Sequence, residues 1–219
     1  MVIILDLGGV LMRHNMPECL ARFERLLGKE QMAQVLGLQS NAEGTLDSLV
    51  DKYEKGDIST DTFVDTILAH SYEGATREEV VAAWNSMHGG IPEERLQLIQ
   101  QWADAGHHLY MLSNNNDLHW HHVFSHYDLS MFRHCYASHL LHLAKPDLRI
   151  YQAVDQAIRE QEGLQETSQL HEVLADNHPF YFVDDLEANR LPAEQLGWRT
   201  FASLDELACA LMVGKKMTK

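Results

Sequence analysis

The stretch that decides the fold of this chain is Val2–Gly9, which reads VIILDLGG. It starts with a short, unbroken apolar run, Val2–Leu5, which is typical of a strand buried on both faces of a parallel sheet. Gly8 and Gly9 then break the run and predict a tight turn. Asp6 stands between the strand and the turn, so we expect its carboxylate to project from the end of a buried strand.

Short apolar runs of the same kind recur along the chain. Each strong run ends in polar residues, as the first one ends in Asp6. Open parallel sheets bind ligands at the carboxyl ends of their strands, so these polar residues mark the expected site. The strong runs are Leu109–Leu112, followed by Ser113–Asn116, and Phe180–Val183, followed by Asp184 and Asp185, and the weaker runs are Cys135–Ala137 and Thr200–Ala202.

Amphipathic patterns separate these apolar runs. Pro92–Ala105 predicts a helix because Leu96, Ile99 and Trp102 recur at helical spacing, and Leu148–Ile158 has a similar pattern. Strands that alternate with helices in this way are typical of a doubly wound sheet. The predicted fold class is therefore α/β, with a Rossmann-like parallel sheet as the core.

Residues 15–87 differ from the rest because they contain no convincing strand pattern. They predict successive helices, one of which begins with the N-cap chemistry of Ser59–Phe63. A helical block placed directly after the first strand predicts a cap over the strand ends. We therefore expect a core of residues 1–14 and 88–219 and a helical cap of residues 15–87, and we interpret the polar segment 160–178 as a surface loop. The predicted helix breaks are Gly28, Gly37, Gly44, Gly56 and Gly74.

The composition restricts the classes of function. The chain has 219 residues, of which 32 are acidic and 17 basic, and its formal net charge of -15 argues against a nucleic-acid partner. No stretch reaches the ~18 apolar residues of a membrane span, and Met1–Asp6 lacks the basic start of a signal peptide. Cys19, Cys135 and Cys209 lie far apart, which suits a reducing compartment. We expect a cytoplasmic protein whose oligomeric state the sequence leaves open.

The residues at the predicted strand ends suggest phosphoryl chemistry. Asp6, Asp184 and Asp185 would repel one another without a cation, and Mg²⁺ is the hard divalent ion that prefers oxygen ligands. With the ion bound, Asp6 can serve both as a ligand and as a nucleophile toward phosphorus. Ser113 and Lys145 would then supply a hydroxyl donor and a positive charge for the transferring phosphoryl oxygens.

Four ordered segments resemble the motifs of the haloacid dehalogenase-like (HAD-like) hydrolase superfamily, and together they span nearly the whole chain. The inserted helices also resemble the small α-helical cap of that superfamily. Within the cap, Glu54–Ser59 is similar to a segment of the subgroup that includes bacterial glucose-1-phosphate phosphatases. The four segments are Ile3–Leu11, Met111–Asn114, Lys145–Pro146 and Phe182–Asp185.

The resemblance implies a role for each motif residue. Asp6 would attack phosphorus and form an aspartyl-phosphate, which makes the expected activity a Mg²⁺-dependent phosphatase acting on a small, sugar-like phosphomonoester. The implied catalytic residues are Asp6, Ser113 and Lys145, the phosphate-binding residues are Gly8, Gly9, Ser113, Asn114 and Lys145, and the metal ligands are Asp6, the backbone carbonyl of Gly8, Asp184 and Asp185, with Asp185 as the direct ligand and Asp184 as its support.

Gly8 is the departure from the superfamily pattern. Most phosphatases of the superfamily carry a second aspartate at this position as general acid and base, a contribution usually worth about 10²–10⁴-fold in rate. The glucose-1-phosphate phosphatase subgroup also tends to have glycine here. A good leaving group would make up for the loss, as would a proton donor from the cap region, and Arg13 and His14 are candidates by location.

Several rival interpretations stay open. A silent HAD-fold binding protein would explain Gly8, whereas a metal-independent dehalogenase would not need Asp184 and Asp185, and a phosphomutase should keep the acid that Gly8 replaces. Seven of the 14 histidines crowd the stretch 119–142, but His122 and His126 lack an HExxH motif, so we interpret this stretch as a polar helix surface and not as a zinc site. His119 is a candidate for lining the active site.

Overall fold

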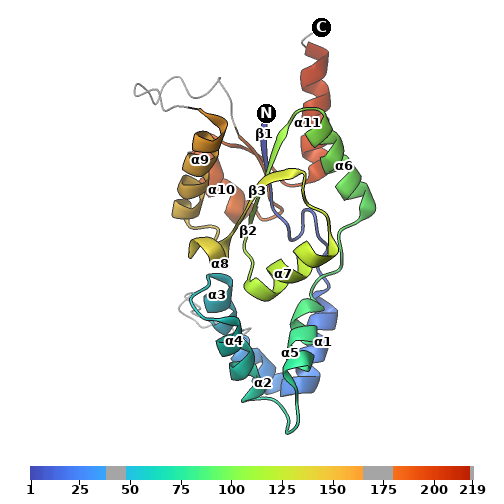
Figure 1. Ribbon diagram of the computed structural model, residues 1–219, viewed down its shortest axis with the longest axis vertical. Coiled ribbons are helices and arrows are strands. Elements are labelled where there is room, and N and C mark those ends of the chain that lie inside the picture. The colour runs from blue at the N-terminus through green and yellow to red at the C-terminus, as the bar shows by residue number, and fades with distance from the viewer. Residues whose placement is uncertain (38–47, 165–179, 218–219) are drawn as a thin grey trace.

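A computed structural model describes residues 1–37, 48–164 and 180–217, and its centre is one five-stranded parallel sheet (Figure 1). The strand order is β3-β2-β1-β4-β5, so the strand with the apolar run at the start of the sequence lies in the middle. Because all strands are parallel, their carboxyl ends meet at one edge. The strands are β1 (Val2–Leu5), β2 (His108–Ser113), β3 (Phe132–Ala137), β4 (Tyr181–Val183) and β5 (Arg199–Phe201).

Helices cover both faces of the sheet, which confirms the predicted α/β class. Alternate residues of β1 enter two separate apolar clusters, because Ile3 and Leu5 face one side and Ile4 faces the other. In Figure 1, α6 and α11 lie on one side of the sheet and α9 and α10 on the other. The core helices are α6 (Glu93–Asp104), α7 (Asp117–His126), α8 (Ser138–Leu141), α9 (Leu148–Glu162), α10 (Glu187–Gln195) and α11 (Leu204–Met217).

The part of the chain between β1 and α6 is helical, as predicted, and its helices form a body of their own below the sheet in Figure 1. It has a separate apolar cluster, in which Phe23, Tyr53, Phe63 and Trp84 are buried against one another. The N-cap prediction is confirmed, since the Ser59 side chain accepts a hydrogen bond from the backbone of Thr62. These helices are α1 (Met16–Leu27), α2 (Lys29–Val35), α3 (Leu49–Glu54), α4 (Thr60–Leu68) and α5 (Arg77–Asn85).

Two antiparallel linkers join the cap to the core. Arg13 donates a backbone hydrogen bond to Gly90 (3.0 Å) and accepts one from Gly89 (2.7 Å), and Asn15 donates one to Met87 (2.7 Å). The two linkers between core and cap therefore run side by side. The division into domains at residues 14/15 and 87/88 stays a prediction.

Three details differ from the sequence-based expectations or lie beyond them. Helix α9 continues through Glu162, so the start of the predicted loop 160–178 is helical, and residues 165–178 lie outside the described residues, as does Gly44. Phe124 of α7 is a large apolar residue that is 40% exposed, and its ring lies 4.6 Å from that of Trp120 between centroids, tilted by 45°.

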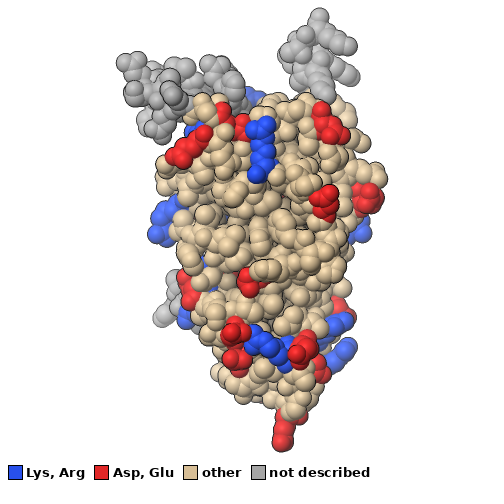
Figure 2. Space-filling view, viewed as in Figure 1, with Lys and Arg blue, Asp and Glu red and all other residues tan. Residues whose placement is uncertain are grey.

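The surface agrees with the acidic composition. On the face in view in Figure 2, basic and acidic side chains are scattered among larger uncharged areas and do not form a continuous basic stripe. Within the described parts of the chain, no helix is both long and apolar enough to cross a membrane.

Candidate active site

Asp6 lies at the carboxyl edge of the sheet, directly after the central strand. Its backbone N–H donates to the carbonyl of Val183 at 2.9 Å, and its Oδ1 accepts a hydrogen bond from the backbone of Leu7 at 2.7 Å. Only 7% of the residue is exposed. The hydrogen bonds to β4 and to the following turn therefore hold this carboxylate in a defined orientation.

Asp184 and Asp185 follow the neighbouring strand β4 and have different surroundings. Asp184 is fully buried, and its carboxylate accepts hydrogen bonds from the backbone of Leu186 (3.0 Å) and from Nδ2 of Asn189 (3.0 and 3.1 Å). Asp185 is exposed, and its carboxylate makes no hydrogen bond to any residue that the structure describes. Asp184 is thus held by the protein, while the carboxylate of Asp185 is available to an outside ligand.

The turn after Asp6 approaches Asp185 closely. Gly9 has a φ of +73°, and a Cβ atom at this position would lie 2.2 Å from Oδ2 of Asp185. Both observations require glycine, because other residues disfavour this backbone conformation and a side chain would collide with the carboxylate. The predicted turn at Gly8 and Gly9 therefore brings the first and last motifs into contact.

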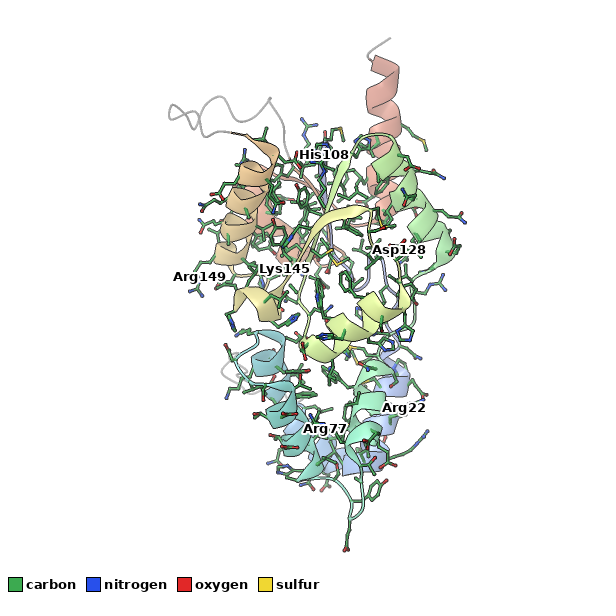
Figure 3. The ribbon with its side chains drawn as sticks, viewed as in Figure 1. Arg22, Arg77, His108, Asp128, Lys145 and Arg149 are labelled. Atoms are coloured by element: carbon green, nitrogen blue, oxygen red, sulfur yellow. The ribbon has the colours of Figure 1, made fainter. Side chains whose placement is uncertain are left out.

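Lys145 supplies the positive charge at this site. Its Nζ lies 3.1 Å from Oδ2 of Asp6 and 2.5 Å from Oδ2 of Asp184, and only 4% of the residue is exposed. Figure 3 shows Lys145 toward the cap-facing end of the sheet, on the side of α8 and α9. The structure thus brings three of the predicted motifs together within direct contact distance.

The side chain of Asn114 holds Lys145 in place. Its Nδ2 donates to the carbonyl of Lys145 and its Oδ1 accepts from the backbone N–H of Lys145, both at 2.8 Å. Ser113 is 2% exposed and donates its hydroxyl to the carbonyl of Asn114 at 3.3 Å, a long hydrogen bond. Both amide atoms of Asn114 are used by the protein, so phosphate binding by this residue stays a prediction, as it does for Ser113.

The site carries more negative than positive charge. Burial raises the pKa of Asp6 from its ordinary value of 3.8 to about 6; Lys145 opposes this rise and Asp184 adds to it. Ligand atoms of Asp6, Asp184 and Asp185 lie within 4.8 Å of one another, so one ion can reach all three. Oxygen donors with a surplus of negative charge suit a hard divalent cation.

The cap places a further acidic group near the site. Burial, together with the charges of Asp51 and Asp6, raises the pKa of Glu54 from its ordinary value of 4.5 to about 7. The carbonyl of Glu54 accepts a hydrogen bond from Ser138 of α8, which docks this end of α3 on the core. Glu54 was not among the predicted site residues, and its only signal in the sequence was its place in the Glu54–Ser59 segment.

His119 is buried and is not part of a polar helix surface, and its place as a lining residue of the active site stays a prediction. This ring is 5% exposed, stacks on Trp84 of the cap at 4.7 Å between centroids, and bonds the carbonyl of Trp84 through Nε2 at 2.9 Å. Trp84 Nε1 in turn donates to Oδ1 of Asn116 at 3.0 Å. His119 therefore links the core to the cap, and among the described residues the one candidate metal cluster consists of Asp6, Asp184 and Asp185.

Several solved structures have a similar fold. A HAD family enzyme from Bacteroides thetaiotaomicron, solved in complex with magnesium and inorganic phosphate, matches with a TM-score of 0.69 and 28% identity over 91% of either chain. A predicted HAD-like family hydrolase from Porphyromonas gingivalis matches with a TM-score of 0.70 and 22% identity over 95% of this chain and 96% of that one. An L-2-haloacid dehalogenase matches with a TM-score of 0.56 and 18% identity over 91% of this chain and 84% of that one. No family model matches the sequence.

The chain therefore has the fold of the HAD-like hydrolases, with a helical insert between the first two strands of the sheet. Its acidic cluster lies at the carboxyl edge, as is usual for the ligand sites of open α/β sheets. Fold and cluster together make this edge of the sheet a candidate metal site.

Proposed function

We propose that this protein is a Mg²⁺-dependent phosphatase that hydrolyses a small, sugar-like phosphomonoester through an aspartyl-phosphate on Asp6. The observation that carries the proposal is the direct contact of Lys145 with Asp6 and Asp184 beside the free carboxylate of Asp185. The match to a HAD family enzyme solved with magnesium and inorganic phosphate supports it. Similarity to glucose-1-phosphate phosphatases and a cytoplasmic location stay predictions.

The metal would be held by Asp6, by the backbone carbonyl of Gly8 and by Asp185. Asp184 would support this set from behind, because Lys145 and Asn189 already occupy its oxygens. When bound, Mg²⁺ supplies positive charge for the oxygens of the phosphoryl group. Asp185 is the better direct ligand since its carboxylate is exposed and meets the turn at Gly9.

The protein residues perform the two half-reactions. In the first, a carboxylate oxygen of Asp6 bonds to phosphorus, the bond from phosphorus to the leaving oxygen breaks, and that oxygen takes up a proton. In the second, a water molecule loses a proton and attacks the phosphorus of the aspartyl-phosphate. The bond from phosphorus to the Asp6 oxygen breaks, which releases phosphate and frees Asp6. Lys145 stabilises the phosphoryl charge throughout, and the Ser113 hydroxyl is suited to donate to a phosphoryl oxygen.

The two rival classes have less support. The dehalogenase neighbour is only 18% identical, which is evidence for the fold alone. In a metal-independent reaction, the negative charges of the three clustered carboxylates would be balanced only in part, by the positive charge of Lys145 beside them. A silent binding protein would have no need for a nucleophile held as tightly as Asp6.

The test is Mg²⁺-dependent release of phosphate from p-nitrophenyl phosphate and from a panel of sugar phosphates. We expect Asp6→Asn to lower kcat/KM by about 10⁴-fold or more, because no other group in the site can replace the nucleophile. Asp104→Asn, an exposed acid at the far end of α6, is the matched control and should leave the rate unchanged. Halide release without metal, or no phosphate release across the panel, would contradict the proposal.

A further inference from the structure

The two glycines after Asp6 leave space that side chains of other segments fill. A Cβ atom at Gly9 would collide with Asp185, as described above, and a Cβ atom at Gly8 would lie 2.6 Å from Nε2 and 2.8 Å from Cε1 of His14. Contacts this short would force the imidazole to move. The ring of His14 thus occupies the space that a side chain at position 8 would fill, two residues from the nucleophile.

The linker between core and cap brings His14 to this position. His14 pairs with His88 in an antiparallel backbone bridge, and the hydrogen bonds of Arg13 and Asn15 to the opposite linker flank it on both sides. The side chain itself is exposed, and no atom of the described residues hydrogen-bonds to its ring. Its nitrogens are therefore available to a substrate while its backbone is fixed.

We propose that His14 donates the proton to the leaving oxygen in the reaction at Asp6, and so performs from the linker the role that Gly8 cannot. This inference rests on the proposed phosphatase function. It is carried by the position of the Nε2 atom against Gly8 and not by the titration of the ring.

The proton transfers balance over the two half-reactions. As the bond from phosphorus to the leaving oxygen breaks, Nε2–H of protonated His14 gives its proton to that oxygen, and the alcohol leaves. Neutral His14 then accepts a proton from the water that attacks the aspartyl-phosphate. The bond from phosphorus to Asp6 breaks, and the site returns to its starting state with one ester hydrolysed.

Other polar groups of the junction are less suited to this role. The guanidinium of Arg13 does not release its proton at neutral pH and lies 3.6 Å from Glu94. His88 and His119 are held neutral, because burial lowers the pKa of His88 to about 4 and that of His119 to about 3. Glu54 of the cap is the serious rival, since burial and the charges of Asp51 and Asp6 raise its pKa.

The test compares two leaving groups in the His14→Gln variant. The alkyl phosphate that the wild type hydrolyses best leaves as an alkoxide and needs the proton, whereas p-nitrophenyl phosphate leaves as a stable phenolate. We expect kcat/KM to fall roughly 10²–10⁴-fold for the alkyl ester and less than about tenfold for the aryl ester. His70→Gln, which changes an exposed histidine of the cap, is the matched control and should change neither rate.

Two outcomes would overturn the proposal while leaving the phosphatase function intact. Equal losses on both esters would show that His14 shapes the site without giving a proton. A leaving-group-dependent loss in Glu54→Gln, with none in His14→Gln, would assign the proton to Glu54. No turnover by the wild type on either ester would instead overturn the proposed function and this inference with it.

Two further variants test the position of the imidazole. Gly8→Ala keeps the histidine but pushes its ring away, so it should show the same selective loss on the alkyl ester. Gly8→Asp combined with His14→Ala puts a carboxyl group into the vacated space and should recover at least about tenfold of the lost alkyl-ester rate relative to His14→Ala. An unchanged alkyl-ester rate in Gly8→Ala would overturn the proposal.

Discussion

The two edges of the sheet differ in how many hydrogen-bond donors and positive charges surround their buried carboxylates. At the carboxyl edge, the carboxylates of Asp6 and Asp184 share the ammonium group of Lys145, and Asp185 lies beside them. At the amino edge, Glu162 is surrounded by donors. Figure 3 shows the two edges through Lys145, which lies toward the cap, and His108, which lies at the opposite end of the sheet.

The carboxylate of Glu162 is hydrogen-bonded by side chains of the neighbouring strands β2 and β3. Its carboxylate bonds His108 Nδ1 at 2.6 Å, Tyr110 Oη at 2.5 Å and Arg133 Nη1 at 3.0 Å, and its side chain is 8% exposed. Burial by itself would raise the pKa of Glu162, but the hydrogen bonds from Tyr110 and His108 and the charge of Arg133 outweigh it and lower the pKa. This carboxylate therefore stabilises the fold as an anion.

The contrast separates a structural carboxylate from functional ones. Donors in excess make Glu162 a fixed link between α9 and the sheet. At the other edge, burial and the charge of Asp184 raise the pKa of Asp6, and the three carboxylates with one lysine leave the cluster in need of a cation. The active-site edge thus gives up stability that a bound metal would restore.

Lys145→Met should have the largest effect on the stability of the active-site edge, because it leaves the carboxylates of Asp6 and Asp184 buried without a positive partner. In metal-free protein at pH 8 we expect the free energy of unfolding to fall by about 3–5 kcal/mol, measured by urea denaturation. Arg149→Met is the control, since the Arg149 side chain is 72% exposed in its pair with Asp147 and should contribute below about 1 kcal/mol. Equal effects of the two variants would show that the acidic cluster is not under electrostatic strain.

Asp6→Asn should raise the free energy of unfolding, in contrast to Lys145→Met, and the size of this increase should depend on pH. The folded pKa of Asp6 is raised to about 6 from 3.8, so its negative charge costs stability above pH 6, and this cost disappears as pH falls toward 3.8. Metal-free Asp6→Asn should therefore exceed the wild type by on the order of 3 kcal/mol at pH 8 and match it near pH 4.

The difference between the two proteins is the quantity to measure. His88 and His119 have lowered pKa values, so the stability that they provide above pH 6.5 is lost as pH falls, against the trend of Asp6. Both proteins contain these histidines, and their effect cancels in the difference. Added Mg²⁺ should narrow the gap at pH 8 by stabilising the wild type, and a gap that does not vary with pH would contradict the assignment to Asp6.

Glu162→Gln sharpens the comparison from the other edge. It removes the charge that Tyr110, His108 and Arg133 share, so we expect a loss of about 1.5–3 kcal/mol in the free energy of unfolding. Phosphatase activity below the unfolding range should stay at the wild-type level. Arg133→Met is the smaller step, because this side chain is 48% exposed and its pair should contribute under about 1 kcal/mol. A lost rate in Glu162→Gln would contradict the division between the two edges.

Local pattern was sufficient for much of the fold. The apolar runs predicted all five strands, and the helical spacing of Pro92–Ala105 predicted α6, because burial of one element leaves a short-range signal in its own sequence. Parallel strands end at one edge, so Asp6 and Asp184 could be expected to meet there. The extension of α9 to Glu162 was missed, since what holds it lies on other strands.

The sequence by itself thus determined the α/β class, the helical insert and the acids at the strand ends, because each depends on residues that are neighbours in the chain. Only the tertiary structure decided which groups surround them. The hydrogen bonds of Asn114 to Lys145 and the imidazole of His14 against Gly8 are contacts through space between separate segments, and the charge of Asp6 acts on Glu54 of the cap. Such contacts depend on how the turns and linkers pack, and no local periodicity records them.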